Sequence, residues 1–292
     1  ANGGTISATG KTVNVSSSTV LISSAMNAGS LFLTSGGTLQ GTGAITVSGA
    51  FNWSGSGASA ISTGGGLTVN GGTTITGAGE KLVNGGVLIL ASDTSWDGAG
   101  RIQLGNSFGS LGGSITNQVT RTFEVSGDGT LANDIGGSGV FNNAGTFLKS
   151  GGLGTTSIRL SNPLTFNNTG RVDVQSGTLS IGATGTHTGL FNVAPGKTLN
   201  FSGDNSFTAE TFQGGGTLTL SGGTQSFAGA NVVTGTTLTV NGATLNGSGS
   251  IALDNASGLN LSSGVIGNAS VTVGGAFNWS GSGASAISTG GG

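Results

Sequence analysis

The residues best suited to chemistry are two carboxylates beside a tryptophan: Asp93, Trp96 and Asp97. Paired carboxylates hydrolyse glycosidic bonds when they lie about 5–10 Å apart, and an indole ring can stack on a sugar. Asp93 and Asp97 share one face of an extended strand, but the strand rise separates them by roughly 13 Å. The spacing favours a polar corner with one packed aromatic residue, and a glycan site is the alternative.

The other reactive residue types form no set that performs catalysis. His187 is the only histidine, and there is no cysteine. A lone histidine cannot build a zinc site without cysteines or a carboxylate cluster, and no spacing argues for a Ser-His-Asp arrangement. The glycine strings lack the lysine and following helix of a phosphate loop, and the GGxGxD calcium repeat does not occur. We therefore expect an outward-facing His187, no metal, no cofactor and no enzymatic activity.

The composition indicates a folded, β-rich chain with few charges. Glycine accounts for 62 of the 292 residues, and charged residues make up 6%, against roughly 25% in ordinary globular domains. Abundant Val, Ile, Leu and Thr with a net charge of -2 argue against disorder. There is no basic patch of the kind that binds nucleic acid. No apolar run is long enough to cross a bilayer, so we expect no membrane insertion in this segment.

An internal duplication defines the organisation of the chain. The segment GAFNWSGSGASAISTGGG begins at Gly49 and recurs unchanged from Gly275 to Gly292. The residues before it agree loosely, since AITVS precedes the first copy and SVTVG the second. We therefore predict one continuous solenoid over residues 1–292, with a repeat unit at 49–274 and the next copy beginning at 275–292. The parent protein is expected to carry tandem copies.

A finer pattern predicts the fold. Apolar-x-apolar triplets alternate with glycine-bearing corners, as in LTVNGGTTITGAG from Leu67 and LTVNGATLNGSGSIAL from Leu238. Such short alternating runs between Gly, Asn and Ser are typical of strands. Phe-Asn pairs at Phe141, Phe166 and Phe191 are spaced 25 apart. A spacing of about 20–25 residues is that of one coil of a three-sided parallel β-helix, so we predict an all-β, right-handed parallel β-helix with coils of that length.

The repeated aromatic and amide residues are the candidate contact positions. Stacked coils would place apolar side chains above one another in the core, and asparagines at equivalent corners could form amide ladders. The alternative is that asparagine tolerates the turn conformation. The Phe-Trp pair of the duplicated segment either packs in the core or forms a contact between neighbouring filaments or repeats. The candidate positions are Phe51, Trp53, Phe277, Trp279, Phe141, Asn142, Asn143, Phe166, Asn167, Asn168, Phe191 and Asn192.

The charged residues concentrate in the middle of the chain. Seven of the eight basic residues lie between Lys81 and Lys197, and nine of the ten acidic residues lie between Glu80 and Glu210. The least regular stretch runs from Asn106 to Asp134. This middle segment is either a binding surface or a broadened coil with ordinary solvated charges, and the second interpretation is favoured.

Several strings resemble the β-strand repeats of giant bacterial surface proteins. These are GTLSIGATGTHTGLFNVAPGKTLNFSG from Gly177, GGTLTLSGG from Gly215 and FNNTGRVDVQSGTLSIG from Phe166. They look like repeats of autotransporter passengers and filamentous-haemagglutinin-type adhesins. The resemblance covers most of the chain at the level of repeats and composition. It implies a right-handed parallel β-helix exposed outside a bacterial cell.

We therefore expect an extracellular structural or adhesive repeat that assembles with copies of itself into a fibre, sheath or stalk. Low charge favours lateral association because little repulsion opposes it. One alternative is a carbohydrate-binding or carbohydrate-active β-helix, with surface glycans as the partner. Another is an ice-binding solenoid, because Thr-x-Thr pairs recur, although their spacing is irregular. These pairs are Thr74/Thr76, Thr120/Thr122, Thr186/Thr188, Thr217/Thr219 and Thr237/Thr239.

Overall fold

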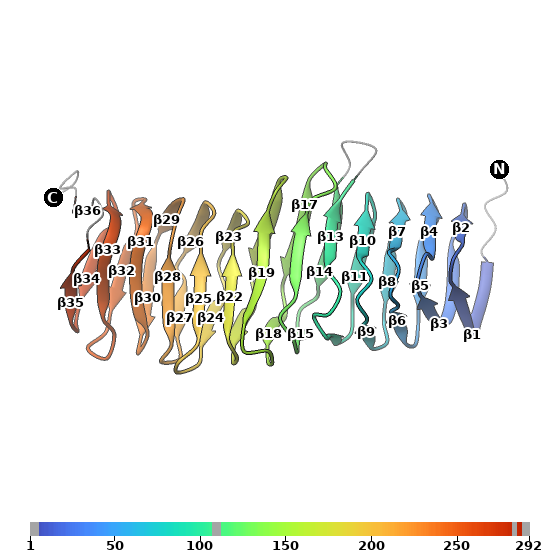
Figure 1. Ribbon diagram of the computed structural model, residues 1–292, viewed down its shortest axis with the longest axis horizontal. Coiled ribbons are helices and arrows are strands. Elements are labelled where there is room, and N and C mark those ends of the chain that lie inside the picture. Colours follow the sequence, from blue (N-terminus) through green and yellow to red (C-terminus); the bar gives the residue numbers. More distant parts are fainter. Residues whose placement is uncertain (1–5, 107–111, 282–284, 288–292) are drawn as a thin grey trace. The chain divides into compact units, whose positions relative to one another are not determined.

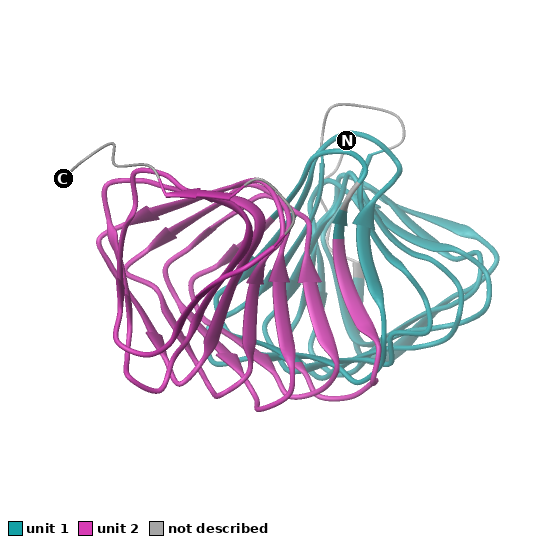
Figure 2. Cartoon of the chain, turned by 60° about the vertical axis from the view of Figure 1, so that its left-hand side comes forward, with its two compact units in different colours: residues 1–148, 159–165 teal, residues 149–158, 166–292 magenta. Residues whose placement is uncertain are grey.

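The computed structural model describes residues 6–106, 112–281 and 285–287, and these residues form strands joined by turns. The fold is a parallel β-solenoid of about 13 turns with ~21 residues per turn. The predicted all-β solenoid is thus confirmed, while its right hand stays a prediction. The chain divides into two compact units (Figure 2), which are described separately. Unit 1 comprises residues 1–148 and 159–165, and unit 2 comprises residues 149–158 and 166–292.

The strands are short, and Figure 1 labels them in chain order. Those wholly within unit 1 are β1 (Ile6–Val15), β2 (Thr19–Ile22), β3 (Met26–Leu33), β4 (Thr38–Gly41), β5 (Ile45–Val47), β6 (Phe51–Trp53), β7 (Ser59–Thr63), β8 (Leu67–Val69), β9 (Thr73–Ile75), β10 (Lys81–Asn84), β11 (Val87–Leu90), β12 (Thr94–Trp96), β13 (Ile102–Gly105), β14 (Gly113–Asn117), β15 (Thr122–Val125), β16 (Thr130–Asn133) and β17 (Gly139–Asn143). Three strands contain residues of both units: β18 (Thr146–Lys149), β19 (Thr155–Leu160) and β20 (Leu164–Asn168).

The strands wholly within unit 2 are β21 (Arg171–Val174), β22 (Thr178–Ile181), β23 (Gly185–His187), β24 (Leu190–Val193), β25 (Thr198–Phe201), β26 (Asn205–Thr208), β27 (Thr211–Gln213), β28 (Thr217–Leu220), β29 (Thr224–Ala228), β30 (Ala230–Thr234), β31 (Thr237–Asn246), β32 (Ser250–Leu253), β33 (Leu259–Ile266), β34 (Ser270–Val273), β35 (Phe277–Trp279) and β36 (Ser285–Ile287). In both units a strand pairs in parallel with a strand of the next coil rather than with its neighbour in sequence.

Three columns of parallel strands run along unit 1, as the three-sided prediction requires. One column is β4, β7, β10 and β13; a second is β5, β8, β11 and β14; the third is β6, β9, β12 and β15. Successive members of the first column lie side by side in Figure 1. Because each coil hydrogen-bonds to the coils before and after it, backbone groups inside a column are satisfied by neighbouring turns.

The inward and outward positions alternate within each triplet. In β8, Leu67 and Val69 are fully buried while Thr68 is half-buried on the outer face. The same pattern of buried, half-buried and buried residues occurs in β5 and β6. A period of two places successive side chains on opposite faces of a strand. The apolar-x-apolar triplets of the sequence therefore form the solenoid core, and the Thr, Ser and Asn residues between them form much of its exterior.

The corners explain part of the glycine content. Gly77 has φ +81° and lies directly against Gly55 of the preceding coil, so a Cβ added to Gly77 would lie 2.7 Å from the carbonyl oxygen of Gly55. An L side chain is disfavoured at that φ, and the stacked coils leave no room for it. Glycine is required at such a corner because the turns of successive coils lie at inter-strand distance.

In unit 1, large and small core residues alternate along the third column. Trp53 of β6 lies opposite Ile75 of β9, and Ile75 lies opposite Trp96 of β12. All three side chains are fully buried. The indole N–H of Trp53 donates to Ser59 Oγ at 2.7 Å, and that of Trp96 donates to the Gly100 carbonyl at 3.1 Å. The alternation keeps two indoles from competing for the same volume in adjacent coils, which close packing of the core requires.

The core of unit 2 contains a stack of aromatic rings. Phe191 and Phe212 are stacked at 5.3 Å between ring centroids, and Phe207 and Phe227 at 5.1 Å. Phe201 meets Phe207 edge-on at 5.2 Å. Parallel in-register pairing repeats the same side-chain position in each coil, so rings one coil apart meet at the distances that favour aromatic pairs.

Candidate functional site

The two carboxylates of the possible glycan site cap corners of unit 1. Asp93 Oδ1 accepts a hydrogen bond of 2.9 Å from the Thr122 N–H, and Asp97 Oδ2 accepts one of 3.1 Å from the Gly77 N–H. Asp97 Oδ1 also accepts from the Ala99 N–H at 2.9 Å. Both side chains are exposed, but each joins its corner to a neighbouring coil. This geometry is that of turn stabilisation.

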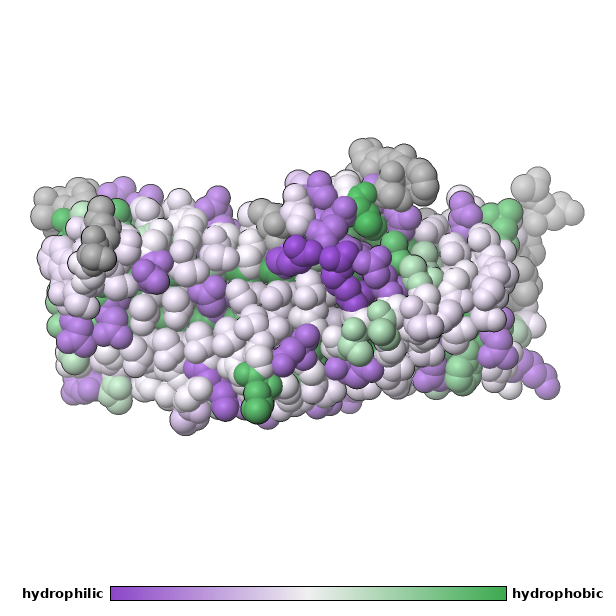
Figure 3. Space-filling view, in the orientation of Figure 1, coloured by the Kyte–Doolittle hydropathy of each residue, from purple (hydrophilic) through white to green (hydrophobic). Residues whose placement is uncertain are grey.

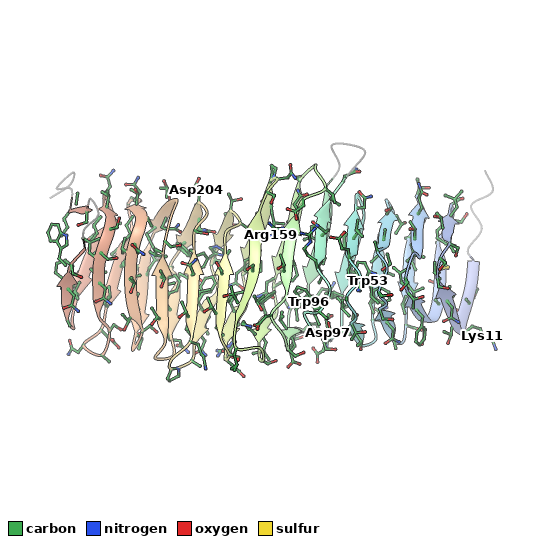
Figure 4. The ribbon with its side chains drawn as sticks, viewed as in Figure 1. Lys11, Trp53, Trp96, Asp97, Arg159 and Asp204 are labelled. Carbon is green, nitrogen blue, oxygen red and sulfur yellow. The ribbon has the colours of Figure 1, made fainter. Side chains whose placement is uncertain are left out.

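Trp96 points into the core, whereas a sugar-stacking residue must be exposed on the surface. Its ring is fully buried between Ile75 and Val125 of the adjacent coils, and it meets Phe123 edge-on at 6.3 Å. Figure 4 labels Trp96 and the neighbouring Asp97 on this part of unit 1. The proposed stacking of a sugar on Trp96 is therefore wrong, because its position alternates inward with the core residues. The favoured interpretation, a polar corner with one packed aromatic residue, describes this site.

The three phenylalanines of the evenly spaced Phe-Asn pairs are buried, but Phe166 and Phe191 belong to different columns. Phe191 of β24 lies opposite Val172 of the preceding coil and Phe212 of the following coil. Phe166 belongs to β20, which pairs with β23 instead. The spacing of 25 residues exceeds one turn of ~21 residues. Phe191 therefore lies in β24, one strand beyond β23, which is the strand that pairs with β20. The predicted equivalence of Phe166 and Phe191 is wrong for that reason.

Phe141 lies in the core of unit 1, opposite Ile115 of the preceding coil. Its ring meets Phe123 edge-on at 5.1 Å. Phe141 is therefore a core residue of its own unit.

Amide ladders occur inside each unit. In unit 1, Asn143 is buried, and its Oδ1 accepts from Asn117 Nδ2 at 2.8 Å. In unit 2, Asn192 Nδ2 donates to Asp173 Oδ1 at 2.8 Å, and Asn192 Oδ1 accepts from Gln213 Nε2 at 3.3 Å. These contacts join successive coils, as stacked amides do.

The remaining predicted asparagines occupy turns and strand faces. Asn167 Oδ1 accepts from both the backbone N–H and the hydroxyl of Thr186, at 3.1 and 3.0 Å. Asn168 is buried and donates to the Gly170 carbonyl at 3.5 Å. Asn142 is half-buried on the outer side of β17, opposite Thr116. The amides therefore serve as both ladder members and corner caps.

His187 lies inside unit 2, although the sequence predicts an outward position, so that prediction is wrong. The ring is fully buried and stacks on Phe207 at 5.0 Å, and its Nε2 lies 3.0 Å from Asn205 Oδ1. Asn205 Nδ2 donates to the Gly203 carbonyl at 2.9 Å, which identifies its Oδ1 as the acceptor and places the histidine proton on Nε2. Burial lowers the pKa of His187 to about 4.

Two charged residues that the sequence pattern did not single out lie inside the coils. Lys81 is fully buried, and its Nζ donates to the carbonyls of Gly77 and Gly79 at 3.1 and 2.6 Å; burial lowers its pKa. Lys149 is also fully buried and donates to the Gly151 carbonyl at 2.9 Å. Both ammonium groups bind carbonyls at their own corners. The sequence signal that could have predicted their burial is that each lysine occupies a position of a triplet where an apolar residue is expected.

Glu210 is a buried carboxyl in unit 2. Its side chain is fully inaccessible, and burial raises its pKa to about 8, while the N–H of Gly189 opposes that shift. Its own backbone N–H donates to Asn231 Oδ1 at 2.9 Å. A carboxyl with such a pKa is largely protonated at neutral pH and therefore avoids the desolvation of a buried charge. A strongly shifted pKa can also mark a functional group, but none of the hollows described for this chain is lined by Glu210.

Unit 1 carries an ion-pair network on its surface. Arg101 pairs with Glu80 at 2.7 Å and with Asp134 at 2.8 Å, and Arg159 pairs with Asp134 at 2.6 Å. A hydrogen bond from Ser161 and the guanidinium groups of Arg159 and Arg101 lower the pKa of Asp134. Arg159, labelled in Figure 4, lies where Figure 3 shows strongly hydrophilic surface.

This network contains four of the eleven charged residues of unit 1. It links residues of different coils, and its opposite charges compensate one another. The coils here are longer than the average of ~21 residues. The sequence separation of stacked partners shows this, since Leu88 pairs with Ile115 and Ile115 pairs with Phe141. A broadened coil with solvated charges therefore describes this region, although residues 107–111 lie outside the described part. Exposed pairs of this kind contribute about 0–1 kcal/mol each.

The duplicated Phe-Trp pair occurs in two environments. Phe51 and Trp53 are fully buried in unit 1, with ring centroids 5.9 Å apart. Phe277 and Trp279 of unit 2 have the same relation at 6.4 Å, but they are 45% and 54% exposed. The pair is thus a core contact in the first copy and a solvent-facing edge in the second. Among the described residues, this edge is the most apolar candidate for a contact with another chain or coil.

No family profile, curated protein or solved structure matches the chain.

Neither a metal-binding cluster nor a membrane-spanning helix occurs in the part of the chain that the structure describes. Its residues contain no group of three or more His, Cys, Asp or Glu side chains that could hold a metal ion. They also contain no helix that is long and apolar enough to cross a membrane. The candidate features that remain are the core stacks, the capped corners, the surface ion-pair network and the apolar edge.

Proposed function

We propose that this chain is a structural or adhesive repeat of a giant bacterial surface protein, which assembles into an extracellular fibre, sheath or stalk. The observation that carries the proposal is that the duplicated segment adopts the same place in its coil both times. Phe51 and Trp53 lie opposite Leu31 and Leu33, while Phe277 and Trp279 lie opposite Leu259 and Leu261.

Finer contacts also recur in the second copy. Trp53 Nε1 donates to Ser59 Oγ at 2.7 Å, and Trp279 Nε1 donates to Ser285 Oγ at 2.6 Å. Ile61 pairs with Leu39, and Ile287 pairs with Ile266. A sequence period that returns to the same coil geometry favours a solenoid that continues through tandem copies, in which each unit contacts only its neighbours.

The exterior supports a structural role. Outward positions of the triplets carry residues such as Thr46, Asn52 and Thr68, which are uncharged and small. Only 6% of the residues are charged, with a net charge of -2. Weak electrostatic repulsion allows such surfaces to approach one another laterally. The resemblance of the repeats to those of bacterial surface adhesins favours a location outside the cell.

Electron microscopy of chains with one, two and three copies of residues 49–274 tests this proposal. We expect rods whose length rises by a constant increment per copy, because each coil adds one inter-strand spacing of about 4.8 Å. Antibody labelling of intact cells that produce the parent protein is expected to decorate their surface. Beads of unchanged diameter would contradict the structural role, and labelling only after lysis would contradict the extracellular location.

A further inference from the structure

The eighteen-residue segment that begins at Gly49 and recurs from Gly275 has a covered first copy and a partly exposed second copy. Comparing the two copies shows which contacts the second copy lacks. Phe277 is 45%, Trp279 54% and Ile287 45% exposed, whereas the residues at the same positions of the first copy, Phe51, Trp53 and Ile61, are fully buried. The sequence is identical over this segment, so side-chain chemistry does not cause the difference. The difference is the following coil, which covers the first copy.

The covering coil of the first copy consists of β8, β9 and β10. In the register, Ile45 lies opposite Leu67, and Trp53 lies opposite Ile75. Phe51 lies opposite Thr73. Large aromatic rings are therefore met by small or branched residues, and this fit gives the close packing that buries both rings.

The second edge consists of β34, β35 and β36, at the C-terminal end of unit 2 (Figure 1). These strands pair with β32 and β33 on one side. A hollow of ≈ 370 Å³ lies there, and the apolar side chains of Leu259, Ile266, Val271, Phe277 and Ile287 are among its lining residues. A parallel edge whose core-facing apolar side chains are not covered by a following coil is a template for another strand.

We propose that this edge binds a coil with the sequence of residues 67–84, supplied by a further copy of the repeat. The register is that of the first copy. Val271 lies opposite the new Leu67, Phe277 opposite the new Thr73, Trp279 opposite the new Ile75 and Ile287 opposite the new Val83. This inference rests on the proposed function and specifies the segment and the register through which consecutive repeats join.

Three features favour this occupant over an unrelated apolar partner. The edge residues Phe277, Trp279 and Ile287 are identical to Phe51, Trp53 and Ile61, which residues 67–84 already cover in unit 1, and Val271 stands where the first copy has Ile45. The volumes match, since Thr73 and Ile75 leave space for the two rings. The new coil also brings its own corner cap, because Lys81 donates to the carbonyls of Gly77 and Gly79 within that same segment.

The fluorescence of Trp279 tests the proposal. The protein has three tryptophans, and Trp53 and Trp96 are fully buried, so a water-soluble quencher such as acrylamide acts mainly on Trp279. The experiment appends the sequence of residues 67–84, which contains no tryptophan, after Gly292 of the full chain. We expect loss of the quenchable component and a blue shift of the emission, because the indole leaves water.

A matched control carries Ile75→Asp and Val83→Asp in the appended segment only. It keeps the length and the glycine corners but places charges against Trp279 and Ile287, so Trp279 is expected to stay quenchable. A Trp279→Phe version of each chain assigns the signal. Far-ultraviolet circular dichroism verifies that the original coils fold in every variant.

The outcomes separate this inference from the proposed function. Equal quenching in the extended and control chains would overturn the inference. Protection in the unextended chain that increases with protein concentration would also overturn it, by showing that a second whole copy covers the edge. Protection of Trp279 by the extension together with the absence of rods in the tandem chains would support the join and reject the fibre.

Discussion

At the scale of single residues, the core of unit 2 holds two titratable groups whose neutral forms are favoured. Burial lowers the pKa of His187 to about 4 and raises that of Glu210 to about 8. His187 is held by Asn205 and by the stacked ring of Phe207. Both groups charge only at the cost of desolvation, so they make the stability of the solenoid depend on pH.

The two shifted pKa values predict a stability maximum with a loss on each side. Folded His187 binds fewer protons than the unfolded chain between its pKa of about 4 and its ordinary value of 6.5, so its contribution is lost as pH falls through that window. Folded Glu210 binds more protons between its ordinary value of 4.5 and about 8, so its contribution is lost as pH rises. Between pH 4.5 and pH 6.5 the two groups change the free energy of unfolding in opposite directions. Above pH 6.5 the free energy of unfolding falls by about 1.4 kcal/mol per pH unit until Glu210 ionises.

Glu210→Gln isolates the alkaline limb of this profile. The amide mimics the neutral carboxyl, so the fall on the alkaline side is expected to disappear while the acid limb caused by His187 stays. Urea unfolding followed by circular dichroism at a series of pH values measures both limbs. An unchanged alkaline limb in the variant would show that Glu210 does not cause it.

At the scale of elements, the coil corners determine how closely successive turns stack. Gly77 has φ +81° and faces the Gly55 carbonyl, while Gly72 has no heavy atom within 4 Å of an added Cβ. Both glycines lie in the same coil, on either side of β9. They therefore form a matched pair, in which one position is constrained by conformation and stacking and the other is open.

Gly77→Ala is expected to destabilise the protein by roughly 1–3 kcal/mol, because an L side chain at that φ is strained and meets the neighbouring backbone. Gly72→Ala is expected to change stability by less than about 1 kcal/mol, because it fills open space and restricts the unfolded chain. Chemical denaturation of both variants measures the difference. Equal effects would show that the corner stacking at Gly77 does not limit stability.

At the scale of the whole molecule, one complete coil is the smallest segment whose insertion or deletion preserves the stacking of the other coils. In unit 2, Thr178, Thr198 and Thr217 are successive partners, and Leu179, Leu199 and Leu218 follow them in register. Solenoid stability is approximately a sum of coil and interface contributions. Removing one whole coil therefore leaves the remaining interfaces able to re-form.

Deletion of residues 198–216 is expected to give a folded, slightly shorter solenoid. The deletion joins Lys197 to Thr217 and brings Leu218 onto Leu179 and Phe227 onto His187, so buried positions again face buried positions. Deletion of residues 198–207 alone removes β25 and nearly all of β26, and it leaves the third strand of the coil without its corner, so it is expected to disrupt folding. Circular dichroism and the cooperativity of thermal unfolding distinguish the two. Misfolding of both variants would contradict coil-wise stability.

Part of this architecture could be predicted from the sequence. Triplets such as Leu67-Thr68-Val69 alternate with period two, and glycine corners follow them, so strands, turns and a parallel solenoid were all expected and are observed. The duplication likewise predicted that Phe277 and Trp279 occupy the same kind of position as Phe51 and Trp53. These properties are local, since they follow from side-chain alternation and from the backbone freedom of glycine.

Which residues meet in adjacent coils was decided only by the tertiary structure. Coil length varies, since Val172 is covered by Phe191 in a short coil whereas Leu88 is covered by Ile115 in a longer one, so a constant spacing in the sequence does not identify stacked partners. His187 lies inside because Asn205 and the ring of Phe207 in the next coil receive it. Lys81 lies inside because the folded corner presents the carbonyls of Gly77 and Gly79 to its ammonium group. The sequence determined the strand and the corner by itself, whereas the register and the burial of polar groups depended on contacts between coils that are distant along the chain.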